Sequence, residues 1–159
     1  MSAETMLKIR EIVSEIERKT DHEMTDIAQM TSPYGLPCFA CYLYMASMNE
    51  VLRQLVASVL EISADQASCP GCRSLKGKCA HLPMSCRVYP CTEKQEILFC
   101  SDCTDFPCDL LHPFSDKAHM WHNMKVFNLC LIKKDGLHAW AKQNARTIRD
   151  TYCFASFTL

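Results

Sequence analysis

Cysteines are the residues in this sequence whose type and spacing most clearly indicate chemistry. The chain has 12 cysteines among 159 residues, and eight of them lie within residues 69–108. Three pairs have the spacing C-x2-C, which directs two sulfur atoms to one centre and is used by zinc knuckles and by iron–sulfur clusters. These pairs are CFAC at 38–41, CPGC at 69–72 and CSDC at 100–103. The candidate metal ligands are Cys69, Cys72, Cys79, Cys86, Cys91, Cys100, Cys103 and Cys108, joined by Cys38 and Cys41.

The spacing indicates that the cysteines are metal ligands more clearly than it indicates which metal they bind. Eight thiolates would complete two sites of four ligands each. A zinc ribbon places about 15–20 residues between its pairs, but Cys72 and Cys100 are further apart and have other cysteines between them. The ferredoxin run C-x2-C-x2-C-x3-C-P is also absent. We expect one or two structural zinc ions, and the alternative is a 4Fe–4S cluster with an electron-transfer or redox enzyme role.

Several other side chains could extend such a site. His81 follows Cys79 and could complete a site of three thiolates and one imidazole, and His112 after Cys108 is a weaker candidate. The stretch HMWHNM at 119–124 could offer soft ligands to copper, but an amphipathic helix with its methionines and tryptophan in the core is the simpler expectation. Cys130 and Cys153 lie in apolar settings, so we expect them to be buried thiols without a metal.

Other chemistries are less well supported. CFAC begins a predicted helix, whose N-terminus could lower the pKa of the first thiol, but the alternating β pattern of a thioredoxin-like fold is missing. No Ser/His/Asp motif, glycine-rich phosphate loop, H-E-x-x-H or paired-carboxylate signature is present. Enzymatic activity is therefore left uncertain. Basic residues within the cysteine stretch are followed closely by acidic ones, so a mixed surface is expected and nucleic acid is an unlikely partner. The expected partner is therefore an unknown small molecule or protein.

The composition and the N-terminal sequence indicate the cellular compartment of the protein. The formal net charge is −1, which gives no general basic field. The N-terminal stretch carries charges throughout and does not have the apolar segment of a secretory signal. The most apolar run, residues 39–48, is too short to cross a bilayer, so we expect no membrane association. The sequence thus predicts a cytoplasmic protein, in which thiols stay reduced and disulfides are disfavoured.

The elements that would position the cysteines are predicted to be helices. A single domain over 1–159 is expected, with a helical part at 1–63, a cysteine-rich metal-binding insert at 64–112 and a second helical part at 113–159. Apolar periodicity and turn residues predict helices over residues 3–19, 20–31, 39–62, 115–134 and 137–150. The insert shows little periodicity and contains several prolines. The fold class is therefore mainly α, with helices flanking an irregular cysteine-rich segment.

The order of these motifs resembles the DUF3795 family, a group of small cysteine-rich proteins of bacteria and archaea. The sequence runs G-L-P-C-x2-C-x-x-Y, a helix, C-x-G-C-R, G-K-C, C-x2-C-x2-F-P-C and finally K-x-x-G-x-x-x-W, over residues 34–143. The resemblance implies a metal-binding protein and does not supply a reaction. The matching residues are Gly35, Cys38, Cys41, Tyr44, Cys69, Pro70, Gly71, Cys72, Arg73, Gly77, Lys78, Cys79, Cys100, Cys103, Phe106, Pro107, Cys108, Gly136 and Trp140.

One position departs from the family pattern. The family usually opens with Cys-Gly, whereas this chain has Tyr34-Gly35. If that cysteine is a ligand elsewhere in the family, this chain lacks one ligand, and Cys38 and Cys41 form an altered site.

Overall fold

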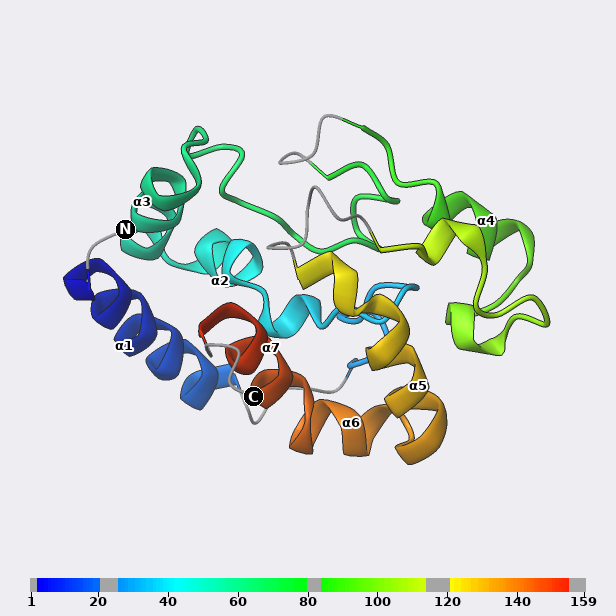
Figure 1. The fold of residues 1–159 in the computed structure, drawn as a ribbon. Helices are drawn as coiled ribbons and strands as arrows, with labels where there is room; N and C mark the ends of the chain where they lie inside the picture. Colours follow the sequence, from blue (N-terminus) through cyan, green and yellow to red (C-terminus); the bar gives the residue numbers. More distant parts are fainter. Residues whose placement is uncertain (1–2, 21–25, 80–83, 114–120, 155–159) are drawn as a thin grey trace.

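The fold is mainly α, as predicted, and is described from a computed structural model (Figure 1). The structure describes residues 3–20, 26–79, 84–113 and 121–154. Within these ranges the single β-type pairing is an isolated bridge between Thr31 and Pro37. The α-helices are α1 (Ala3–Thr20), α2 (Tyr42–Met48), α3 (Glu50–Leu60), α4 (Val88–Lys94), α5 (Lys125–Asp135), α6 (Leu137–Gln143) and α7 (Ala145–Phe154). Short 3-10 helices are η1 (Cys38–Ala40), η2 (Cys100–Asp102), η3 (Asp109–Leu111) and η5 (Trp121–Met124).

The N-terminal helix was predicted from its amphipathic pattern, and this prediction is confirmed. α1 buries Ile9 and Val13 against α2 and α3 and exposes its charged face. The next helix was predicted over residues 20–31. Residues 21–25 of that stretch lie outside the described part of the chain, and residues 26–30 form turns.

The long helix predicted over residues 39–62 is wrong as a single element. Asn49 has an extended backbone (φ −142°, ψ 115°), and its side-chain oxygen accepts a hydrogen bond from the backbone N–H of Leu52 at 2.9 Å. Asparagine caps a helix well because its side chain satisfies a free backbone donor. The apolar residues on both sides concealed this cap, and the segment folds into α2 and α3, which pack on each other.

The C-terminal helices are separated at Gly136 and at Asn144. The predicted break at Asp135–Gly136 is confirmed, and Gly136 adopts the positive φ of 83° that glycine accommodates without strain. The helix predicted over 137–150 is wrong as one element, because Asn144 separates α6 from α7. Of the helix predicted over 115–134, residues 115–120 lie outside the described part, and η5 and α5 form the rest.

Two clusters of buried side chains form the interior. One joins α1, α2 and α3 and includes Cys69. The other surrounds Trp140, whose ring meets that of Phe39 edge-on at 6.2 Å, and includes Cys72, Cys79 and Cys100. In Figure 1 the helices α1–α3 lie on one side of the molecule and α4 with the cysteine-rich loops on the other, while α5, α6 and α7 run beneath both. Much of the cysteine-rich segment is therefore part of the core.

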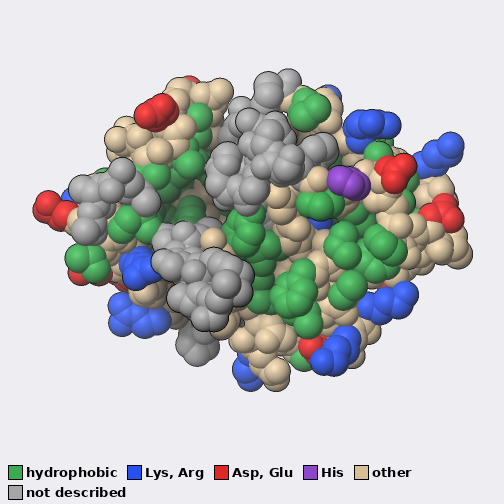
Figure 2. Space-filling view, in the orientation of Figure 1, with side chains coloured by type: hydrophobic (Ala, Val, Ile, Leu, Met, Phe, Trp, Pro, Cys, Tyr) green, Lys and Arg blue, Asp and Glu red, His purple; other side chains and the backbone are tan. Residues whose placement is uncertain are grey.

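The visible surface carries charges of both signs. Figure 2 shows hydrophobic side chains gathered near the centre of one face, with basic and acidic side chains at its margins. Among the described residues, no helix combines the length and apolar character needed to cross a membrane.

Candidate metal centre

Arg73 organises the irregular segment that carries most of the cysteines. Its Nε donates hydrogen bonds to the carbonyl oxygens of Ala28 (3.0 Å) and Thr31 (2.8 Å), and its Nη2 donates to that of Leu98 (2.6 Å). The guanidinium also lies 5.5 Å from the centre of the Phe99 ring. One half-buried cation thus joins three stretches that are far apart in sequence. The composition of the segment had indicated only a solvated mixed surface for this arginine.

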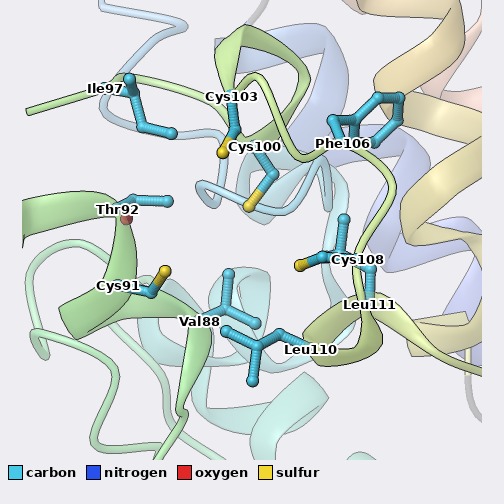
Figure 3. A pocket seen from close by; sticks show the side chains of 10 residues that line it. All are labelled: Val88, Cys91, Thr92, Ile97, Cys100, Cys103, Phe106, Cys108, Leu110 and Leu111. Carbon is cyan, nitrogen blue, oxygen red and sulfur yellow. The ribbon is translucent and has the colours of Figure 1, made fainter. Parts of the chain in front are cut away.

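Four cysteines face one small cavity, and we call them the outer sulfur group. Cys91 comes from α4, Cys100 begins η2, Cys103 follows η2, and Cys108 precedes η3. All four line a cavity of about 20 Å³, and Figure 3 shows their sulfur atoms directed toward the space between them. This convergence brings together residues separated by up to 17 positions in sequence.

Backbone hydrogen bonds hold the loops that carry the outer sulfur group. The Cys100 N–H donates to the Pro33 carbonyl at 2.9 Å, and the Cys103 N–H donates to the Cys100 carbonyl at 3.1 Å. The Phe99 N–H donates to the Asp102 carboxylate at 3.2 Å. Apolar side chains form much of the remaining cavity wall. They are Val88, Ile97, Phe106, Leu110 and Leu111.

A second set of cysteines lies deeper, and we call Cys38, Cys69, Cys72 and Cys79 the inner sulfur group. The Cys72 thiol is hydrogen-bonded to that of Cys79, and the Tyr34 hydroxyl lies 2.7 Å from the Cys72 sulfur. Interactions among the four thiols shift their pKa values, which places them within electrostatic reach of one another. The structure therefore brings the two pairs CFAC and CPGC toward a shared interior region.

Burial raises the pKa of Cys38 and Cys69 in the inner group and of the neighbouring Cys41. It raises the pKa of Cys38 to about 12 and that of Cys41 to about 11. Hydrogen bonds from Cys79 and then Tyr34 lower the pKa of Cys72 to about 7, and the same Cys72–Cys79 bond raises the pKa of Cys79. The negative charge of the pair thus falls on Cys72. The raised pKa of Cys38 opposes the thioredoxin-like activation that a helix N-terminus would give.

Cys86 and Lys125 interact electrostatically with members of both sulfur groups. The pKa of Cys79 in the inner group is raised mainly by its hydrogen bond with Cys72 and that of Cys100 in the outer group mainly by burial, and Cys86 makes a smaller electrostatic contribution to both shifts. Lys125 is half-buried, with its Nζ 5.5 Å from the centre of the Tyr34 ring. Burial lowers the pKa of Lys125, while the charges of Cys86, Cys100 and Cys72 oppose that shift. This lysine is a cation near both groups, and no spacing in the sequence indicated it.

Gly77 explains the G-K-C motif in physical terms. Its φ is 77°, and a Cβ atom at this position would lie 2.7 Å from the Cβ of Tyr89 and 3.2 Å from that of Cys86. Any side chain would therefore push apart the turn that precedes Cys79. The glycine allows the loop that carries Cys86 to approach closely.

The ligand type fits a thiophilic metal, but the present spacing of the sulfur atoms is wide for a single ion. Zinc–sulfur bonds of about 2.3 Å keep any two sulfur ligands of one ion within about 4.6 Å. Across the described ranges, no three His, Cys, Asp or Glu side chains are arranged to hold one metal ion. The outer group instead surrounds an open cavity, so a single ion would require the thiols to move inward.

The remaining candidates fall outside both groups. His112 is exposed, with its Nδ1 2.7 Å from the carbonyl oxygen of Pro113. His81, His119 and Met120 lie outside the described residues, as does the side chain of Cys153. The expectation that Cys130 is buried is wrong, because it lies on the exposed face of α5. The eleven described cysteines are free thiols.

Comparison with protein families confirms the resemblance carried by these motifs. A family model described as "Protein of unknown function (DUF3795)" matches residues 30–113, which is more than half of the chain. The chain belongs to the DUF3795 family. The DUF3795 match contains the whole of both sulfur groups and ends before α5, so Gly136 and Trp140 lie beyond it. No curated protein and no solved structure matches the chain.

Proposed function

We propose that this DUF3795 protein binds metal through its cysteine-rich centre, with the outer and inner sulfur groups as two separate sites. The observation that carries the proposal is the convergence of Cys91, Cys100, Cys103 and Cys108 on one cavity. Four thiolates from a loop-rich segment are a common ligand set for zinc and for iron–sulfur clusters. Structural zinc is the metal that the sequence favours, and iron–sulfur is the alternative.

The role of the metal would be to hold the irregular segment together. Residues 84–113 contain one short α-helix and two 3-10 turns, which have little intrinsic stability. A metal bound by four thiolates contributes its binding free energy to folding. The flanking helices would then present a surface to a small molecule or a protein. Reduced thiols are required throughout, which agrees with a cytoplasmic location.

Metal analysis of paired variants tests this proposal. We expect the wild-type protein, purified without oxygen, to contain bound metal. Cys103→Ser should remove the metal of the outer group, and Cys72→Ser should remove that of the inner group. Cys130→Ser is the matched control, since its exposed thiol lies outside both groups, and it should keep the wild-type metal content. Metal-free wild-type protein, or equal metal in all four proteins, would refute the proposal.

A further inference from the structure

The outer sulfur group surrounds a space instead of meeting at a point. Figure 3 shows Cys91, Cys100, Cys103 and Cys108 approaching that space from different sides. The cavity measures about 20 Å³, which exceeds the ~10–15 Å³ that one water molecule needs. The four sulfur atoms therefore leave at least a water-sized space between them and do not converge on one point.

The arrangement of the ligands agrees with a larger occupant. Four thiolates on one zinc ion crowd together, because each sulfur is bonded to the same atom. In an iron–sulfur cluster the thiolates are shared among several iron atoms, so their sulfur atoms stand further apart around the cluster. The four sulfur atoms of the outer group, spread around a common cavity, match the second arrangement.

The wall of the cavity also suits a cluster. Val88, Ile97, Phe106, Leu110 and Leu111 form an apolar lining, and an apolar shell limits the access of water to a metal centre. Cys108 is the exposed member of the group. The site therefore lies close to the surface while most of its lining is hydrophobic.

We propose that the outer sulfur group binds an iron–sulfur cluster rather than a single zinc ion. This inference rests on the proposed metal-binding function and identifies the chemical class of the metal at one of its two sites. The inference does not extend to the inner sulfur group. There the Cys72 and Cys79 thiols are hydrogen-bonded and the Tyr34 hydroxyl lies 2.7 Å from the Cys72 sulfur, so the thiols contact protein groups instead of lining the same cavity.

The test uses the full-length protein, with ferric iron and sulfide as the probe and zinc alone offered to a second sample. Metal-free protein is reconstituted under a reductant without oxygen, and iron, acid-labile sulfide, zinc and the visible spectrum are measured. We expect a broad visible absorption band with about two to four iron atoms per chain and an equal amount of sulfide. Cys108→Ser should lose most of this iron and absorbance, whereas Cys130→Ser should retain it. Both variants change exposed thiols, and far-UV circular dichroism checks that both remain folded.

Three results would overturn the inference, and they separate it from the proposed function. Colourless protein that takes up zinc but no iron or sulfide would refute the cluster and leave metal binding intact. Protein that binds neither zinc nor iron would refute both. A cluster that survives Cys108→Ser and Cys103→Ser but is lost in Cys72→Ser would place it in the inner group and refute the assignment to the outer group.

Discussion

Tyr34 shows how a single residue can alter a sulfur site. Its hydroxyl lies 2.7 Å from the sulfur of Cys72, a member of the inner sulfur group. Burial raises the pKa of Tyr34 well above its usual value, so the hydroxyl stays protonated and can donate to the thiolate. Tyr34 therefore acts as a hydrogen-bond donor to one of the proposed ligands. Such donors tune the ligands of metal sites.

Tyr34→Phe should destabilise the protein. The substitution keeps the ring but removes the tyrosine donor from the buried Cys72 sulfur, which keeps its hydrogen bond with Cys79, so we expect the free energy of unfolding to fall by about 1–3 kcal/mol. Urea denaturation under reducing conditions measures it. Tyr44→Phe is the control, because the Tyr44 hydroxyl makes only a 3.7 Å contact with the sulfur of Met30, and its effect should stay within about 0.5 kcal/mol. Equal effects of the two variants would contradict the role of the Tyr34 hydroxyl.

At the scale of elements, Arg149 joins the C-terminal helix to the N-terminal half. Its Nη1 donates to the Glu17 carboxylate of α1 at 2.8 Å and to the Ala40 carbonyl of η1 at 3.0 Å. Its side chain is only 4% exposed, and its Nε donates to Asp150 at 2.8 Å. Because Ala40 lies between Cys38 and Cys41, this contact supports the chain that carries the first cysteine pair.

Arg149→Met should be strongly destabilising. It removes the buried cation, while the Glu17 carboxylate, whose side chain is 16% exposed, keeps its second ion pair, with Arg146 at 3.2 Å. Breaking a buried pair costs about 3–5 kcal/mol when the remaining charge is left unpaired, so we expect a cost near the lower end of that range. Thermal and chemical denaturation measure the change. Lys19→Met is the control: its pair with Glu15 is largely exposed, so it should change stability little. A cost for Arg149→Met no greater than that of the control would refute the anchoring role.

For the whole molecule, the two halves differ in what stabilises them. α1 has 18 residues and shares a buried apolar cluster with α2 and α3. Residues 84–113 consist of short elements whose side chains surround the outer sulfur group. Short helices are marginal without tertiary support. The N-terminal helices should therefore depend less on metal than the cysteine-rich segment does.

Removing the metal should loosen one half selectively. On chelation under reducing conditions, we expect amide hydrogen exchange to increase by at least about tenfold in residues 84–113 and to change little in α1 and α3, since local opening follows local stability. Hydrogen-exchange mass spectrometry locates the change. Cys103→Ser, examined without chelator, should reproduce this pattern. Uniform loss of protection across the chain, or none at all, would contradict it.

Local pattern predicted much of the fold. The amphipathic spacing of α1, the irregularity of the cysteine-rich segment and the break at Gly136 follow from neighbouring residues, so the sequence was sufficient for them. The breaks at Asn49 and Asn144 were missed, because apolar residues on both sides continue the helical pattern through each asparagine. Cys130 was predicted to be buried because of its apolar neighbours, but its exposure depends on which face of α5 packs inward.

The sequence by itself determined the chemistry available to this protein: thiolates, in pairs whose short spacing directs two sulfur atoms to one side of a turn. Only the tertiary structure decided which pairs meet. Cys91 joins Cys100, Cys103 and Cys108 because α4, η2 and η3 line one cavity, and Tyr34 reaches Cys72 across 38 residues. Spacing constrains only the residues within one turn, whereas contacts between distant segments follow from how the whole chain buries its apolar surface.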